Sequence, residues 1–336
     1  MHIALTYDLK EDYLARGFAP EMAAEFDSLE TINALAETIM RLGHAVTRIG
    51  NYAALADWLA LGQRPDLVFN ICEGEQGLGR EARVPALLET VQIPFVFSDV
   101  AVLTLALHKG LSKLAVRGLG LATTDFYQVE SLASLDRLIA GTVPLSFPLF
   151  VKPVAEGTSK GIDGLSRIDT ADRLYQRCSE LLERFRQPVL IERYLPGREF
   201  TVGIVGTGAK ARVVGIMEIV FAHEDTASIY SYAAKFVDNS SWIRYQVPEP
   251  EICQTLSEAA LKIWRGFGCR DGGRIDFRED EAGVLQFLEI NPLAGLNPDY
   301  GDLPIICKLA GLNYDELVGA ILASAIERLE EQHVLV

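Results

Sequence analysis

Apolar residues in the first hundred positions alternate between short runs of strand length and longer stretches at helical spacing. Residues 28–42 carry apolar side chains on one helical face, and Gly43 follows as a helix stop. A second helix is expected over residues 84–91. Strands are expected over residues 3–7, 45–49, 66–71 and 94–97. Strands that alternate with helices in this way are typical of an α/β fold with a doubly wound parallel sheet.

The rhythm changes after about residue 100, where a helix is expected over residues 103–119. Strands over residues 149–152 and 189–192 then flank a helix over residues 171–185, which predicts a small α+β lid. From about Gly197, β-branched strands, a hairpin over residues 274–291 and a closing helix over residues 314–329 predict an antiparallel sheet. The expected organisation is three modules, over residues 1–100, 101–195 and 196–336.

Composition argues against several classes of protein. The chain has 336 residues, 49% of them hydrophobic, and no apolar run approaches the roughly 20 residues of a membrane helix. The formal net charge of −15 argues against a nucleic-acid partner, which needs a clustered positive field. The start at Met1 reads as a strand rather than a signal peptide, so a cytoplasmic protein without a membrane partner is expected. The five cysteines are scattered, which favours buried structural thiols over a zinc site or disulfides.

The hairpin over residues 274–291 carries the most informative polar residues. Strand periodicity places Arg274 and Asp276 on one face of the first strand, and Glu289 and Asn291 on one face of the second. Two carboxylates and an amide oxygen can therefore converge, and such ligands suit Mg²⁺ held together with substrate phosphates. A solvated polar face of an amphipathic hairpin explains the same residues about equally well.

Two further motifs point to a nucleotide. Lys152 ends an apolar strand and runs into a loop of small residues, Glu156 to Gly161, whose backbone N–H groups can cradle phosphate oxygens. Glu192 and Glu199 lie at the two ends of a strand-to-loop exit, where backbone atoms and an acid can bind adenine and ribose. Each motif alone is weak evidence, because glycine-rich turns and strands with charged ends are common.

These motifs and their order resemble the ATP-grasp fold, and most closely the D-alanine–D-alanine ligase family. The resemblance covers nearly the whole chain and is specific from Pro148 to Ala325. The matching stretches are FPLFVKPVAEGTSKGI, VLIERYLPGREFTVGIVG, YAAKF, GGRIDF and FLEINPLAGL, with a weaker match in LALHKGLSKLAVRGLGL. The resemblance implies an ATP-dependent ligase that needs ATP and Mg²⁺ or Mn²⁺, acts on small-molecule carboxylates and amines, and forms a homodimer.

The resemblance also implies roles for the matched residues. Those expected to contact the nucleotide are Lys109, Lys152, Glu156, Gly157, Glu192, Tyr194, Leu195 and Glu199. The expected metal ligands are Asp276, Glu289 and Asn291. The residues expected at the reacting groups are Arg274, which stabilises a tetrahedral intermediate, Lys235, Thr158 and Ser159. In the implied mechanism a carboxylate attacks the γ-phosphate of ATP, and an amine then attacks the resulting acyl phosphate.

The chain departs from this family in the amino-acid pocket. Phe236 replaces the tyrosine that follows the loop lysine, and Thr158 replaces the first loop serine. The family's His-Gly loop is replaced by residues 73–81, where Glu73 and Arg80 become candidate substrate contacts, Arg80 for an anion. The glutamate that holds the first substrate's ammonium group in the family has no clean counterpart, and the nearest candidates are Glu25, Asp27 and Ser28.

The acceptor site is also altered. Gly301 or Asp302 stands where the family has the serine that binds the acceptor's carboxylate. An anionic Asp302 repels a carboxylate, and a missing donor leaves that carboxylate unpaired. The acceptor is therefore expected to be an amino acid other than D-alanine, or an amine. An ATP-grasp kinase and a non-catalytic nucleotide-binding protein are the alternatives, which a stable phosphorylated product or a lack of ATP hydrolysis distinguishes.

Overall fold

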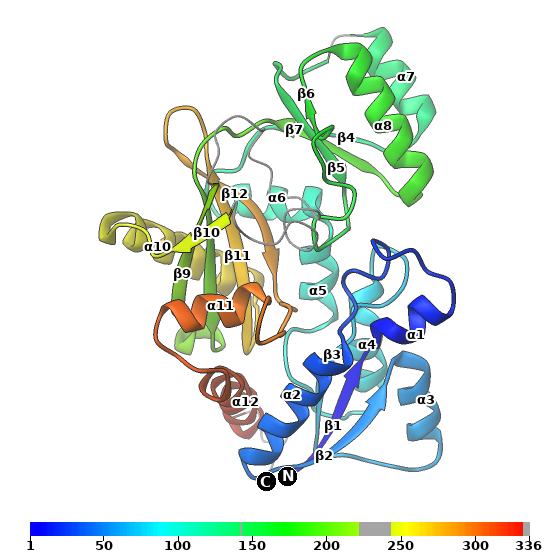
Figure 1. Ribbon diagram of the computed structural model, residues 1–336, viewed down its shortest axis with the longest axis vertical. Helices are drawn as coiled ribbons and strands as arrows, with labels where there is room; N and C mark the ends of the chain where they lie inside the picture. Colours follow the sequence, from blue (N-terminus) through cyan, green and yellow to red (C-terminus); the bar gives the residue numbers. More distant parts are fainter. Residues whose placement is uncertain (142, 222–242, 332–336) are drawn as a thin grey trace.

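The computed structural model describes residues 1–141, 143–221 and 243–331, which form three sheets with helices packed around them (Figure 1). The N-terminal sheet has three parallel strands in the order β2-β1-β3, namely β1 (His2–Tyr7), β2 (Ala45–Gly50) and β3 (Leu67–Ile71). Its helices are α1 (Lys10–Ala15), α2 (Leu29–Arg41), α3 (Tyr52–Ala60), the short η1 (Arg80–Ala82) and α4 (Arg83–Thr90). The expected parallel α/β arrangement is confirmed.

Residues 94–97 do not form the fourth strand that their apolar pattern predicts. They meet the sheet through a single parallel bridge between Val68 and Phe95. Phe97 has a φ of 76°, and a strand cannot continue through a residue with a positive φ. The Phe97 N–H donates instead to a carboxylate oxygen of Asp271 at 2.8 Å. Asp271 is fully buried and also accepts from the Arg328 guanidinium at 2.8 Å. This carboxylate therefore fixes the N-terminal part of the chain to the C-terminal part.

The central sheet is antiparallel, with the strand order β4-β7-β5-β6. Its strands are β4 (Phe126–Val129), β5 (Leu149–Pro153), β6 (Arg167–Ile168) and β7 (Val189–Arg193). The helices α7 (Leu132–Ala140) and α8 (Ala171–Phe185) contact each other and lie side by side in Figure 1. The strands and the helix expected between residues 149 and 192 are confirmed.

The C-terminal sheet has five antiparallel strands in the order β10-β9-β8-β11-β12. They are β8 (Glu199–Val205), β9 (Arg212–Phe221), β10 (Ile243–Gln246), β11 (Gly272–Glu279) and β12 (Leu285–Asn291). The accompanying helices are the short η2 (Gly208–Lys210), α10 (Pro250–Phe267), α11 (Asp302–Leu309) and α12 (Tyr314–Glu331). The expected hairpin and closing helix are confirmed, whereas the three module boundaries stay a prediction.

The single helix expected over residues 103–119 is wrong, because the chain breaks it at His108. Two helices result, α5 (Val100–Leu107) and α6 (Lys109–Gly118). His108 is extended, with φ −86° and ψ 92°, and its ring Nδ1 accepts from the N–H of Leu111 at 3.2 Å. The ring therefore caps α6 in place of a backbone bond, which agrees with a structural role for this histidine. Both helices contact β12, so the break places Lys109 beside the C-terminal hairpin.

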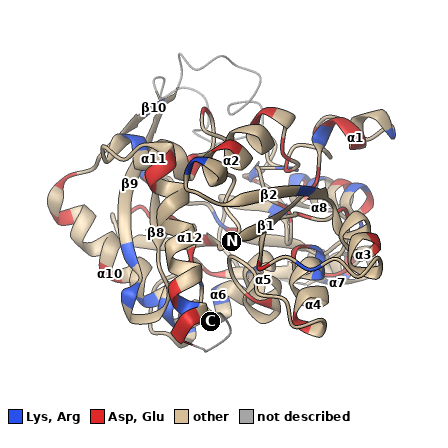
Figure 2. Cartoon of the chain, turned by 90° about the horizontal axis from the view of Figure 1, so that it is seen from below, with Lys and Arg blue, Asp and Glu red and all other residues tan. Residues whose placement is uncertain are grey.

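Charged residues of both signs occur on helices of the N-terminal and C-terminal parts, for example on α1 and α11 in Figure 2.

The five cysteines are free thiols, and four of them are buried, as expected for structural thiols. Among the described residues, no helix has the length and apolar character that a membrane crossing requires.

Candidate active site

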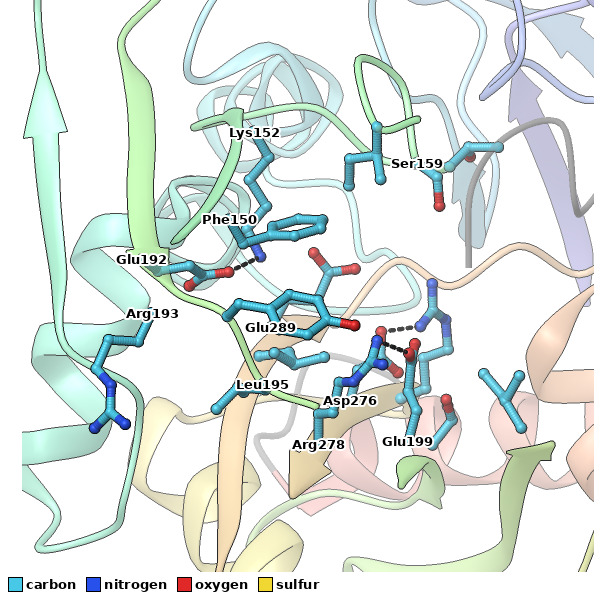
Figure 3. A pocket seen from close by; sticks show the side chains of 17 residues that line it. Phe150, Lys152, Ser159, Glu192, Arg193, Leu195, Glu199, Asp276, Arg278 and Glu289 are labelled. Atoms are coloured by element: carbon cyan, nitrogen blue, oxygen red, sulfur yellow. Dashed lines mark hydrogen bonds and ion pairs between the residues drawn. The ribbon is translucent and has the colours of Figure 1, made fainter. Parts of the chain in front are cut away.

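A cleft lies between the central and C-terminal sheets and contains about 790 Å³ of empty space. Lys152 on β5 and the loop residues Thr158 and Ser159 line it from the central side, while Asp276 on β11 and Glu289 on β12 line it from the other (Figure 3). The lysine-bearing glycine loop and the acidic hairpin, which lie more than a hundred residues apart in the sequence, therefore share one cavity.

Two buried lysines hold the carboxylate of Glu192. Lys152 Nζ lies 2.7 Å from Glu192 Oε1, and Lys113 Nζ lies 2.9 Å from Oε2. Burial alone raises the pKa of Glu192, but Lys113 and Lys152 together lower this pKa to about 2. The carboxylate expected at the adenine is thus already paired, and it positions the Lys152 ammonium in the cleft (Figure 3).

The sequence reasoning missed Lys113. It follows Lys109 by four positions, so both lysines lie on one face of α6. This helical spacing is the feature of the sequence that could have identified Lys113 as a site residue. Lys113 is fully buried and also bonds the Thr123 hydroxyl at 3.0 Å and the Phe287 carbonyl at 3.2 Å. It therefore joins α6, the central sheet and β12 behind the cleft.

Acid should destabilise the protein through Glu192. Because its pKa falls from 4.5 to about 2 on folding, the unfolded chain binds more protons than the folded one between these values. The stabilisation that Glu192 gains from Lys113 and Lys152 is present above pH 4.5 and is lost as the pH falls toward 2. We expect the difference in thermal midpoint between wild type and Glu192→Gln to shrink over this range. A difference that stays constant from pH 4.5 downward contradicts the assignment.

Lys109 spans from α6 to the acidic hairpin. Its Nζ lies 3.2 Å from Glu289 Oε2 and donates to the backbone carbonyl of Glu156 at 2.5 Å. Lys109 is only 6% exposed, so its positive charge lies in the site rather than in solvent. Burial raises the pKa of Glu289, but Lys109 and Arg274 outweigh it and lower the pKa, so Glu289 stays ionised.

The hairpin brings its polar residues together as the strand periodicity predicts. Asp276 pairs with Glu289 across the strands, and Arg274 pairs with Asn291. The Asn291 amide nitrogen lies 3.3 Å from Asp276 Oδ2 and 3.4 Å from Glu289 Oε1, and Arg274 forms an ion pair with Asp276. Burial raises the pKa of Asp276 to about 7 although Arg274 opposes it, and the charge of Glu289 adds to the rise.

This donor set fits a metal that arrives with a nucleotide. In the described part of the chain, no group of three or more His, Cys, Asp or Glu side chains is arranged to hold a metal ion. Two carboxylates and one amide are present instead, and Mg²⁺ is normally held by one or two carboxylates together with substrate phosphates. Asp276 Oδ1 is buried and has no hydrogen-bond partner among the residues that the structure describes, so this oxygen is available as a metal ligand.

The same cleft is also lined by an aromatic side chain, an aliphatic side chain and a further acid. Tyr194 and Leu195 line it directly after β7, and the Tyr194 ring lies 6.5 Å from the Phe150 ring between centroids. Glu199 lines the cleft too, and its Oε2 accepts from Arg278 Nη1 at 3.0 Å (Figure 3). The resemblance assigns these residues to adenine and ribose, and this assignment stays a prediction.

The glycine loop is fastened to the N-terminal part by Glu25. Its Oε1 accepts from the Gly157 N–H at 2.5 Å, and Oε2 lies 2.5 Å from Lys160 Nζ. Arg80 donates to both Glu25 oxygens, at 2.8 and 2.9 Å, and to the Ala155 carbonyl at 2.6 Å. The Gly157 N–H, expected to contact phosphate, is thus engaged by a carboxylate. Thr158 and Ser159 have positive φ values of 50° and 56°, which form a sharp turn at the cleft.

A second pocket adjoins the first and contains about 630 Å³ of empty space. The two share Thr158, Arg274 and Glu289, so a group bound in one lies next to a group bound in the other. The second pocket is also lined by several carboxylates and one lysine, namely Glu25, Glu73, Glu81, Glu156 and Lys109. Glu73, an expected substrate contact, therefore lines this pocket, and its role stays a prediction.

Glu25 lines the second pocket, whereas Arg80, Asp27, Gly301 and Asp302 line neither pocket. Arg80 is 4% exposed and uses its guanidinium on Glu25 and Ala155, so it supports the wall of the pocket. Asp27 lies beside Asp8, and burial together with that neighbouring charge raises its pKa to about 7. Asp302, the first residue of α11, lies 3.4 Å from Arg274, and Gly301 precedes it. Lys235 and Phe236 lie outside the described residues.

The cleft between two antiparallel sheets, beside a parallel N-terminal sheet, is the arrangement of the ATP-grasp fold. Solved structures support this fold. D-alanine–D-alanine ligase from Bacillus anthracis complexed with ATP matches with a TM-score of 0.73 and 21% identity, covering 99% of each chain. VanG D-Ala:D-Ser ligase from Enterococcus faecalis matches with a TM-score of 0.72 and 19% identity, covering 96% of this chain and 99% of that one.

Sequence comparison defines the family within this class. The family model for the D-Ala-D-Ala ligase C-terminus matches residues 116–323. D-alanine–D-alanine ligase from Brucella anthropi is 33% identical over 321 residues, covering 93% of this chain and 96% of the relative. The enzyme from Aquifex aeolicus is 30% identical over 295 residues, covering 88% of this chain and 94% of the relative. The chain belongs to the D-alanine–D-alanine ligase family.

Proposed function

We propose that the chain activates a small-molecule carboxylate with ATP as an acyl phosphate and joins it to an amine, releasing ADP and phosphate. One observation supports it most directly: Lys152 from the central side and the carboxylates of the hairpin line one cleft, and this cleft shares Thr158, Arg274 and Glu289 with a second pocket. A nucleotide in the first cavity therefore directs its terminal phosphate toward a substrate in the second.

The residues of the cleft match the parts of Mg²⁺–ATP. Tyr194 and Leu195 bind the adenine and Glu199 the ribose, while Lys109 and Lys152 contact the phosphates. Asp276, Glu289 and Asn291 would hold the metal. The metal supplies neutralisation of the charge that spreads over the phosphoryl oxygens during transfer.

In the first step, a carboxylate oxygen of the donor attacks the γ-phosphorus, and ADP leaves with the bonding electron pair. In the second step, the amine attacks the acyl carbon, the C–O bond to phosphate breaks, and the amine loses a proton. Arg274 lies where both pockets meet, so its guanidinium stabilises the negative oxygen that develops in this step. Both steps use charges already present in the site, and neither needs a covalent bond to the protein.

The acceptor we propose is an amino acid other than D-alanine, or an amine. Asp302 lies 3.4 Å from Arg274 at the position that the family uses for the acceptor's carboxylate. The other candidate position is Gly301, where an added Cβ would lie 2.6 Å from the Asn297 carbonyl oxygen, so no side-chain donor fits there. A carboxylate at this place would meet a like charge and no hydroxyl. A cytoplasmic location and a homodimer stay predictions.

Two measurements test this function. Calorimetry with ATP should show affinity that depends on Mg²⁺, and ADP release with pairs of amino acids and amines should identify a pair that gives an amide by mass spectrometry. D-alanine alone should give little D-alanyl-D-alanine. A lack of Mg²⁺-dependent ATP affinity contradicts the ligase proposal, as does a stable phosphorylated product without an amide. Efficient D-alanyl-D-alanine synthesis contradicts the proposed acceptor alone.

A further inference from the structure

Two carboxylates from different parts of the fold hold the guanidinium of Arg274. The Nη1 atom forms an ion pair with Asp276, two positions along the same strand, and Nη2 lies 3.4 Å from Oδ2 of Asp302 at the start of α11. The three side chains are between 9% and 13% exposed. A guanidinium carries five N–H groups, so these two ion pairs leave donors for a third group. Arg274 is therefore held at two corners, which sets the direction of its remaining donors.

The approach of α11 to Arg274 depends on a residue without a side chain. Gly203 on β8 is the register partner of Arg274 on β11, so side chains at the two positions point to the same face of the sheet. A Cβ added to Gly203 would lie 2.9 Å from Leu303 Cδ1, so α11 packs directly on this face. Leu303 is fully buried and follows Asp302 in the helix. The glycine therefore lets the start of α11 lie beside the strand that carries Arg274.

The turn before α11 is fixed by the buried side chain of Asn297. Its amide nitrogen donates to the Thr31 hydroxyl on α2 at 2.8 Å. Its amide oxygen accepts from the N–H groups of Asp299 and Tyr300 at 2.9 and 3.1 Å. Asp302 lies in the first turn of the helix that follows, where the helix dipole favours a negative charge. The fold itself therefore sets the position of the Asp302 carboxylate.

Asp302 lies next to the reacting groups without lining the space that would hold them. In the part of the chain that the structure describes, Arg274 lines both pockets and Asp302 lines neither. Asp276 is also a proposed metal ligand, whereas Asp302 is not, so Asp302 holds Arg274 whatever Asp276 binds. A donor that is fixed before the reaction stabilises a developing negative charge better than one that must reorient. An effect of Asp302 on the chemistry therefore has to pass through Arg274.

We propose that Asp302 is a positioning residue for the second step of the reaction. It holds the Arg274 guanidinium so that an N–H group faces the negative oxygen that develops when the amine attacks the acyl carbon. Without the Asp302 carboxylate, the guanidinium turns toward Asp276, and the developing oxyanion loses this donor. The inference rests on the proposed function and adds to it a residue that acts on the reaction only through Arg274.

The test uses hydroxylamine as the amine, because it has no carboxylate or side chain that Asp302 could contact. The full chain with Mg²⁺–ATP is supplied with hydroxylamine and, in turn, with each of the common D- and L-amino acids. ADP release and hydroxamate formation are measured together. Asp302→Asn keeps the size of the side chain and removes its charge, so it should lower kcat for hydroxamate formation about 10-fold, with the KM for ATP nearly unchanged. The ratio of ADP to hydroxamate should rise, because acyl phosphate that the amine captures slowly is lost to water.

Three further variants show whether the effect passes through Arg274. Asp302→Glu restores the charge and should recover most of the lost kcat. In the Arg274→Lys background, Asp302→Asn should cost less than about 2-fold more, because the group on which it acts is already gone. Asp299→Asn is the matched control, since this exposed acid lies three positions earlier in the same turn, and it should keep the wild-type kcat and ratio. Thermal unfolding of each variant shows whether the fold is intact.

The outcomes separate the two proposals. If Asp302→Asn keeps the wild-type kcat and ratio, or if its loss recurs in full in the Arg274→Lys background, the positioning role is refuted and the ligase function stands. A loss that appears only as a raised KM for a larger acceptor, with hydroxylamine unaffected, assigns Asp302 to the acceptor and also refutes positioning. If wild type forms neither hydroxamate nor amide with any carboxylate, the ligase function fails, and this inference fails with it.

Discussion

Replacing Arg274 by lysine is expected to lower kcat about 100-fold or more while the KM for ATP changes little. The Arg274 side chain is 13% exposed, forms an ion pair with Asp276 and lies 3.4 Å from Asp302, where the two pockets meet. A planar guanidinium can satisfy these carboxylates and still present an N–H to the developing oxyanion, whereas a lysine concentrates its charge at one point. The measurement is ADP release with the substrate pair identified in the test above.

Arg173→Lys on the exposed surface of α8 is the matched control, and it should leave kcat unchanged. Thermal unfolding separates loss of catalysis from loss of structure, because Arg274→Lys keeps the positive charge beside Asp276 and Asp302. A variant that folds normally and retains wild-type kcat rules out the proposed role of Arg274 in the second step. A rise in the KM for ATP alone assigns Arg274 to nucleotide binding instead.

Much of the nucleotide site could be predicted from the sequence because its geometry is local. Period two along a strand decides which side chains share a face, and it correctly grouped Arg274 with Asp276 and Glu289 with Asn291. A lysine at the end of an apolar strand before a loop of small residues predicted the place of Lys152 in the same way. These features need only the periodicity of one strand and its turn.

The partners of the buried charges could not be predicted in this way, because they are far apart in sequence. Glu192 pairs with Lys113 across α6 and the central sheet, and no periodicity relates the two positions. Asp271 bonds the backbone of Phe97, and this distant contact helps to end the expected strand over residues 94–97. The break of the helix at His108 also depends on a side-chain cap that the apolar pattern does not reveal.

A buried group of charges joins the N-terminal part to the glycine loop, with Glu25 at its centre. Arg80 and Lys160 both contact this carboxylate, and all three side chains are at most 5% exposed. Burial raises the pKa of Glu25, but the two cations outweigh it and lower the pKa to about 2. The carboxylate is therefore ionised at neutral pH and compensates two buried positive charges, so its loss leaves both of them short of a partner.

Glu25→Gln is therefore expected to lower the free energy of unfolding by about 3–5 kcal/mol, the cost of removing one partner from a buried ion pair. The midpoint of urea unfolding at neutral pH measures this change. Glu75→Gln, which removes an exposed partner of Arg16, should leave the midpoint nearly unchanged, because exposed ion pairs contribute little. Equal midpoints for the two variants contradict the central role of Glu25. A stable Glu25→Gln protein with a raised KM for the carboxylate substrate instead assigns Glu25 to the substrate.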